Sequence, residues 1–148
     1  MSIFKSAIED FMSKNAAGVW KVLGRVINAT TRTPAGEFLV TQSSKLAGAA
    51  VAGMGLYGIQ KSGDVRQVAE DFARVMGEFG WDFEFGNSTE DEVEIFMLDC
   101  PGKLEGEEAC LAGMEADVEL VRRLGAKLEI HETIATGADR CRLTVVRP

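Results

Sequence analysis

The sequence lacks a hydrophobic run long enough to cross a bilayer. Its most apolar stretch, 46–59, has 14 residues, whereas a spanning helix needs about 20. The first residues, MSIFKSAIEDFMSKN, alternate charged with apolar side chains, and they contain neither the continuous apolar segment nor the small-residue cleavage site of a secretory signal. We therefore expect a cytoplasmic protein with no membrane span, in which 46–59 forms a buried helix.

Basic residues are also in short supply. The chain has 16 Lys and Arg against 23 Asp and Glu, a net charge of -7. Binding to a phosphate backbone requires clustered basic side chains, so nucleic acid is not an expected partner. Thirteen of the acidic residues lie within 81–119, which holds a single lysine. Such a block is most simply a solvated face, and its alternative role is to bind a cation or a basic partner.

Cysteine is scarce and several catalytic motifs are missing. A chain of 148 residues can bury a core without disulfides. The three cysteines, an odd number in a cytoplasmic setting, are therefore expected to be free, catalytic or metal-binding rather than paired. The sequence has no Ser-His-Asp order, phosphate-binding loop or dinucleotide-binding glycine pattern, so nothing indicates those enzyme classes.

The helical pattern dominates the first half of the chain. Apolar residues recur every three or four positions from Ser2 to about Ala29, with NAAG at 15–18 as a candidate break. The segment TTRTPAGEF supplies a turn, and a second helix is expected from near Glu37. A third, amphipathic helix should begin after Asp64 as its N-cap and end at Gly80.

The segment LAGAAVAGMGLYGI has unusually little side-chain bulk for a helix. Each interior glycine costs about 1 kcal/mol relative to alanine, so the glycines need a reason. Close approach of another helix is the first explanation, a wall for a flat ligand the second, and a broken helix the third. On the ligand interpretation, Gly53 and Tyr57 contribute to a pocket.

The second half of the chain predicts strands. Apolar and charged residues alternate over 81–85 and 93–97, which indicates a hairpin. A helix follows from Gly106 to about Leu124, and a final hairpin joins 127–135 to 140–146. The order of these elements predicts one α+β domain, 1–148, with a four-stranded, mainly antiparallel sheet of two hairpins packed against three to four helices.

The three cysteines fall at element boundaries that can converge. Cys100 ends a strand, Cys110 lies about one turn into a helix, and Cys141 faces the core from the last strand. With His131 they are the residue types that bind zinc, but they lack the C-x2-C spacing and His131 should face away, so we predict no metal. Cys110 near a helix N-terminus is either a nucleophile or a buried core thiol.

Asp117 follows Cys110 by seven residues and can share its helix face. In that position a carboxylate is able to orient or deprotonate a group in the same pocket. Gly113 and Met114 lie between the two residues on the same helix. We therefore group Cys110 and Asp117 as candidate catalytic residues, and Gly113 and Met114 as candidate ligand-binding residues.

The last third of the chain carries a family resemblance. In CLAGMEADVELVRRLGAKLEIHETIATGADRCRLTV, a Cys, a small residue and a helix precede a strand ending in Glu-Thr and a Gly-x-Asp-x-Cys turn. The residues are Cys110, Gly113, Glu132, Thr133, Gly137, Asp139 and Cys141. This order resembles the vinyl-reductase-type hydrocarbon-binding domains, and the resemblance implies a helix-and-sheet pocket for a small or apolar ligand.

The span that begins at DCP also resembles a second family. A Cys-Pro, a second Cys, a downstream Asp and a T-x-A-x-G-x-x-x-C hairpin are similar to the aminothiazoline-carboxylate hydrolase-like proteins. The matching residues are Cys100, Pro101, Cys110, Asp117, Thr133, Ala135, Gly137 and Cys141. This resemblance implies hydrolysis of a small cyclic amidine, with a thiol and a carboxylate in the pocket.

These observations lead to one expected function and two alternatives. We expect a small-molecule-binding, sensor-like domain whose pocket lies between the glycine-rich helix and the C-terminal hairpin, lined by Cys100, Cys110 and Cys141. The first alternative is a C–N hydrolase with Cys110 as nucleophile and Asp117 as its acid–base partner. The second is a structural module that forms a homodimer through the small-residue helix face.

Overall fold

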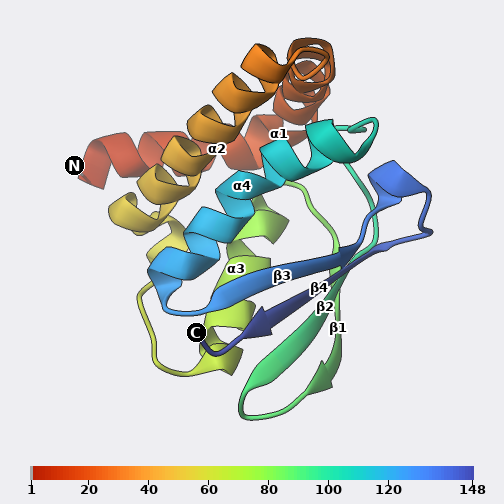
Figure 1. Ribbon diagram of the computed structural model, residues 1–148. Helices are drawn as coiled ribbons and strands as arrows, with labels where there is room; N and C mark the ends of the chain where they lie inside the picture. The colour runs from red at the N-terminus through yellow and green to blue at the C-terminus, as the bar shows by residue number, and fades with distance from the viewer. Residues whose placement is uncertain (1) are drawn as a thin grey trace.

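The computed structural model describes residues 2–148, which form four α-helices, two short 3-10 helices and four strands (Figure 1). In chain order the elements are α1 (Ser2–Thr30), α2 (Pro34–Met54), η1 (Leu56–Gly58), α3 (Val65–Glu78), β1 (Phe83–Ser88), β2 (Glu92–Met97), α4 (Glu107–Leu124), β3 (Lys127–Glu132), η2 (Ile134–Thr136) and β4 (Cys141–Val146).

The strands form one antiparallel sheet in the order β1-β2-β4-β3. Two hairpins, β1–β2 and β3–β4, are joined where β2 pairs with β4, for example Ile95 opposite Leu143. Both of those side chains are fully buried. The predicted fold class, an α+β domain with a four-stranded antiparallel sheet of two hairpins, is confirmed.

Helix α3 has the cap and the buried apolar face that the sequence predicts for the third helix. The carboxylate of Asp64 accepts the backbone N–H of Arg66 at 3.0 Å, which caps the helix as predicted. Val68, Phe72 and Val75 are fully buried on one face. The regular spacing of these apolar side chains places α3 against the sheet.

The first two helices differ from the expectation in detail. The NAAG segment does not break α1, which is a single helix. Helix α2 begins at Pro34 rather than near Glu37, because Thr33 caps it by accepting the N–H of Gly36. It ends at Met54, where Gly55 takes a left-handed conformation with φ 57°. The expectation of a buried helix over 46–59 is therefore wrong: the helix stops within this segment, and Leu46 is 73% exposed.

Close packing of two helices accounts for Gly48, one of the glycines in the glycine-rich segment. A Cβ placed on Gly48 would lie 2.2 Å from the carbonyl oxygen of Ala116, so α2 and α4 pack backbone to backbone there. Gly53 has no such neighbour. Close helix packing is therefore the reason for Gly48 and helix termination the reason for Gly55.

The elements are arranged in layers. Helices α3 and α4 contact the sheet, and α2 packs along α4 (Figure 1). Helix α1 joins α2 on the side of the molecule away from the sheet (Figure 1). Within 2–148, no helix has both the length and the apolar character needed to cross a membrane.

Candidate functional site

A small cavity lies where α1, α4 and two connecting segments meet. Its volume is about 40 Å³, enough for roughly three water molecules at 10–15 Å³ each. The walls are mostly apolar and include both tryptophans of the chain. The lining residues are Trp20, Gly24, Ile27, Met76, Trp81, Gly102, Leu104, Gly113, Met114, Ala116 and Asp117.

Asp117 is the one ionisable side chain in this wall. It is 6% exposed, and burial raises its pKa from 3.8 to about 7. No neighbouring cation or hydrogen-bond donor within 2–148 offsets the effect of burial on this pKa. At neutral pH the carboxyl group is therefore divided between its neutral and charged forms.

The two tryptophans differ in whether their indole N–H groups donate a hydrogen bond. Their rings meet edge to face, with centroids 5.3 Å apart and planes at 82°. Trp20 donates its N–H to the carbonyl oxygen of Phe79. Trp81 Nε1 is buried and has no acceptor among the residues that the structure describes. Trp81, whose indole N–H has no acceptor, and Asp117, whose carboxyl group is poorly solvated, thus line the same small cavity.

The segment from Cys100 to Gly106 covers the cavity. Asn28 of α1 holds it at two points: its amide Nδ2 donates to the carbonyl of Lys103 at 3.0 Å, and its Oδ1 accepts the N–H of Glu105 at 2.9 Å. Gly102 lies against Gly24 of α1, and Leu104 contributes to the cavity wall. We call residues 100–106 the cover loop.

The cover loop bends through residues with positive φ. Lys103 has φ 48° and Gly106 has φ 86°. The lysine value is unusual for a residue with a Cβ and costs on the order of 1 kcal/mol. The hydrogen bonds of Asn28 help to hold this backbone in place, together with the one from Gly106 N–H to the carbonyl of Ala135.

The three thiols lie near one another but do not line the cavity. Cys110 and Cys141 are each 4% exposed, and Cys100 is half-buried. Burial raises the pKa of Cys110 to about 11; a hydrogen bond with Thr133 opposes this rise, and Cys141, Cys100 and Asp117 add to it. These electrostatic effects require the four groups to be close in space. At neutral pH the Cys110 thiol is protonated.

Two thiols also accept backbone hydrogen bonds. Ile134 N–H donates to Cys141 Sγ at 3.2 Å, and Leu104 N–H donates to Cys100 Sγ at 3.4 Å. Burial raises the pKa of Cys141 as well. Cys100 thus helps to shape the cover loop from within, while Cys110 and Cys141 belong to the core.

His131 is not part of this thiol group. It is exposed on β3, and its Nε2 lies 2.6 Å from the hydroxyl of Thr144 on the neighbouring strand. Across residues 2–148, no three His, Cys, Asp or Glu side chains are arranged to hold a metal ion.

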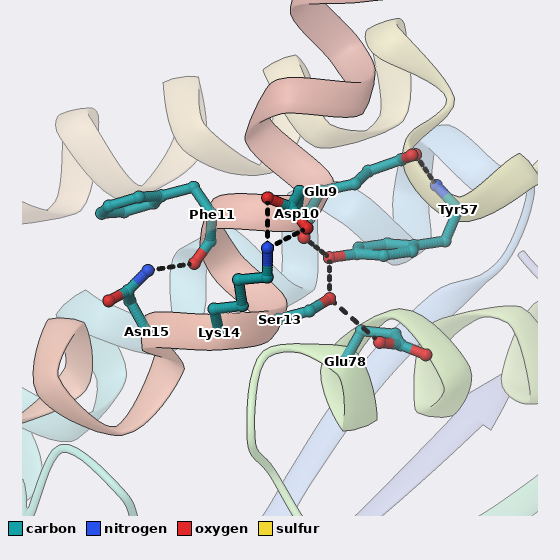
Figure 2. A network of polar contacts seen from close by, with 8 residues as sticks. All are labelled: Glu9, Asp10, Phe11, Ser13, Lys14, Asn15, Tyr57 and Glu78. Carbon is teal, nitrogen blue, oxygen red and sulfur yellow. Dashed lines mark hydrogen bonds and ion pairs between the residues drawn. The ribbon is translucent and has the colours of Figure 1, made fainter.

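Gly53 and Tyr57 lie away from the cavity. Gly53 is exposed, and nothing lies within 4 Å of a Cβ added to it. Tyr57 has φ 56° and fastens η1 to α1 (Figure 2): its N–H donates to a carboxylate oxygen of Glu9 at 2.6 Å, and its hydroxyl donates to the Glu9 carbonyl at 2.9 Å. Ser13 and Glu78 extend this network, and the tyrosine hydroxyl points into it (Figure 2).

The structure therefore divides the predicted site residues into three groups. Gly113, Met114 and Asp117 line the cavity. The cysteines at 100, 110 and 141 lie together beside it, and the two residues predicted from the glycine-rich segment lie elsewhere. The cavity is formed by α1, α4, the cover loop, Met76 of α3 and Trp81, and no residue of the second helix or the last hairpin lines it.

Sequence reasoning missed the residues that α1 contributes. Trp20, Gly24 and Asn28 sit on the buried face of a helix whose pattern was interpreted only as core packing. A weak signal was present, because the chain has two tryptophans and both reach the cavity. The partner of Asn28 is 75 residues away in sequence, so no local pattern indicates it.

Comparisons with known proteins identify no family for this chain. No protein-family model matches it, and no curated protein matches it. Among solved structures, it is similar to a trafficking protein particle complex subunit 3 from Naegleria fowleri covalently bound to palmitic acid. The TM-score is 0.46 and the identity 12%, over 96% of this chain and 81% of the other.

Proposed function

We propose that this domain is a cytoplasmic, sensor-like binding protein for a small, mostly apolar molecule, and that it works as a homodimer. The observation that carries the ligand proposal is that two polar residues line the same cavity: Trp81, whose buried Nε1 has no acceptor within 2–148, and Asp117, whose carboxyl pKa is raised by burial. A buried polar group without a partner costs about 1–3 kcal/mol, so an otherwise apolar wall that retains the unpaired indole N–H beside a poorly solvated carboxyl group indicates a polar group to be recognised.

The two groups define the chemistry of the ligand head. The indole N–H is a donor only, and an ionised carboxylate is an acceptor only. A head that both accepts and donates a hydrogen bond satisfies both, as an amide or a hydroxyl does. The remaining wall, with Met76, Met114 and Leu104, fits an apolar body, and methionine adapts to ligands of irregular shape.

The cover loop provides the route for entry and the response to binding. The cavity of about 40 Å³ is far below the 300–1,000 Å³ of ordinary ligand sites. Binding therefore requires residues 100–106 to move away from α1. This coupling of occupancy to the position of a loop and a helix is what makes the domain sensor-like.

The thiols favour binding over hydrolysis. A cysteine nucleophile acts as its thiolate, and burial raises the pKa of Cys110 to about 11. The acidic side chains of Glu107 and Glu108 in the first turn of α4 do not favour a thiolate either. For these reasons we propose ligand binding rather than cyclic amidine hydrolysis.

Fluorescence tests the proposal, because the chain's two tryptophans line the cavity. Benzamide, which donates and accepts hydrogen bonds, should change the emission in a saturable way and bind more tightly than toluene. Trp81→Phe removes the indole N–H, keeps a ring and should reduce the preference for benzamide by roughly 3- to 10-fold, the worth of one hydrogen bond. Asp117→Leu should reduce the preference similarly.

The control is Asp82→Asn, which changes an exposed carboxylate outside the cavity. Its preference for benzamide should equal that of the parent. Native mass spectrometry of the protein purified from its own host should also show a retained small molecule. Absence of a retained molecule, together with no emission change with either compound at 10 mM, would remove the ligand proposal.

A further inference from the structure

Helices α1 and α2 expose apolar side chains that no other residue within 2–148 covers. Twelve large apolar side chains are exposed within 2–148, and nine of them lie on these two helices. At about 150–250 Å² for a large side chain, their exposed fractions amount to on the order of 1,000 Å². The nine are Ile3, Phe4, Phe11, Val22, Leu23, Val26, Phe38, Leu39 and Leu46.

That area is large by two measures. The largest apolar patch on an ordinary monomer covers about 300–600 Å², and each partner in a standard interface buries about 800 Å². The summed exposed apolar area of α1 and α2 is therefore as large as one partner's share of a stable protein–protein contact, and leaving it in water is costly at about 25 cal/mol per Å².

Helix α2 presents a seam with the spacing of paired helices. On one face of α2, small and apolar residues and one glutamine are exposed or half-exposed. They recur in alternating steps of four and three residues, which is the spacing of side chains that pack against a second helix. The opposite face, with Val40 and Gly48, is already buried. The seam residues are Ala35, Leu39, Gln42, Leu46, Ala49 and Gly53.

Helix α1 adds a shallow, mainly apolar groove to the same layer. It runs along the helix from Phe11 to Leu23. Gly18 lies in this groove with nothing within 4 Å of an added Cβ. An interior helical glycine costs about 1 kcal/mol relative to alanine, and no contact inside the chain explains it. The same is true of Gly53 on the α2 seam.

The charges around the seam favour a second copy over a lipid surface. A helix that lies on an anionic membrane needs a strongly basic polar face. Helix α2 has only Glu37 and Lys45 as charged residues. On α1, Lys5 and Lys14 pair with Glu9 and Asp10, which leaves Lys21 and Arg25 as its remaining basic residues. The two helices together are therefore not strongly basic, and the seam residues themselves are uncharged. The seam residues of two copies pair without like-charge repulsion, although Lys61, Arg122 and Arg123 border the hollow at Gly53. The hollows at Gly18 and Gly53 leave room for bulky side chains such as Phe11 or Leu46 of the other copy.

We infer that α1 and α2 form the surface through which two copies of this chain associate. This inference rests on the homodimer proposed above and is independent of the ligand. A closed pair uses the same patch on both copies, which covers the apolar side chains without leaving a further site for growth into filaments.

Analytical ultracentrifugation of the full chain between 5 and 200 µM tests the surface. The parent should sediment as a dimer, and Leu46→Glu and Phe11→Glu should each weaken dimerisation at least 100-fold. Gly53→Leu should act in the same direction by filling a hollow. Leu111→Glu is the matched control, because Leu111 is 40% exposed on α4, outside the layer, and its dimer should be unchanged.

The outcomes separate the alternatives. Circular dichroism should show equal helicity in all four variants, as expected for substitutions at exposed sites. If Leu46→Glu and Phe11→Glu both remain dimeric, the proposed α1–α2 surface is wrong, although the proposal of a homodimer still holds. A monomeric parent overturns both and leaves the ligand proposal intact. A monomeric parent that cosediments with phosphatidylcholine–phosphatidylserine vesicles assigns the layer to a membrane instead.

Discussion

Gly24 of α1 and Gly102 of the cover loop meet backbone to backbone. A Cβ added to Gly24 would lie 1.7 Å from the carbonyl oxygen of Gly102, closer than any real contact allows. The absence of a side chain at position 24 is therefore what lets the loop close over the cavity. This contact joins two segments that are 78 residues apart in sequence.

Gly24→Ala should push the cover loop away from α1. We expect a loss of about 1–3 kcal/mol in the free energy of unfolding, as for overpacking of a tight contact, and faster exchange of the amide protons in 100–106. Urea unfolding and hydrogen exchange measure the two effects.

The matched control for this prediction is Gly77→Ala. Gly77 is also helical, on α3, but nothing lies within 4 Å of its added Cβ. This substitution should stabilise the protein by up to about 1 kcal/mol through helix propensity. Equal effects of the two substitutions would contradict a special contact at Gly24.

The elements with strong local signals were predictable from the sequence. Helix α3 has a capping aspartate, a regular apolar face and a buried partner surface, and α4 ends at Gly125 in a left-handed conformation as predicted. The strands were predictable because charged and apolar residues alternate. In these segments local preference and tertiary packing agree.

The site was less predictable, because it depends on contacts between distant segments. The sequence placed Gly113, Met114 and Asp117 on one helix, and they do line the cavity. Nothing local, however, shows that Asn28 holds the cover loop or that Trp81 lacks an acceptor. The glycine-rich pattern indicates a pocket at Gly53, which lies outside the cavity beside Asp117 and lines a separate hollow. A glycine close to another helix and an open glycine look the same in sequence.

Asp117 should make the stability of the protein depend on pH. Its pKa is about 7 in the folded protein, against 3.8 for the free group, so the folded state binds more protons between these values. The free energy of unfolding should therefore fall as the pH rises from about 4 to 7. At 1.36 kcal/mol per pKa unit, the loss is at most about 4 kcal/mol.

Asp117→Asn should flatten this pH dependence and make the protein more stable than the parent at pH 8. Urea unfolding at pH 5, 6, 7 and 8 provides the measurement. Asp82→Asn, which alters an exposed carboxylate, should retain the slope of the parent. If Asp117→Asn retains that slope too, Asp117 is not the buried group responsible.

The three thiols should differ strongly in reactivity. At pH 8 the half-buried Cys100 should react first with a chromogenic disulfide reagent, since it lies in the cover loop. Cys110 and Cys141 are buried, and burial raises the pKa of both thiols, so they should react only as the protein unfolds. Cys100→Ser should abolish the fast phase, and Cys110→Ser should leave it unchanged.

The same reaction reports on the cover loop. Asn28→Ala removes both hydrogen bonds that join the side chain of Asn28 to the loop, and it should accelerate the fast phase by freeing Cys100. Asn28→Asp keeps an acceptor for the N–H of Glu105 and should have a smaller effect. A fast phase that survives Cys100→Ser and disappears in Cys110→Ser would reverse the assignment and favour a reactive Cys110, as the hydrolase alternative requires.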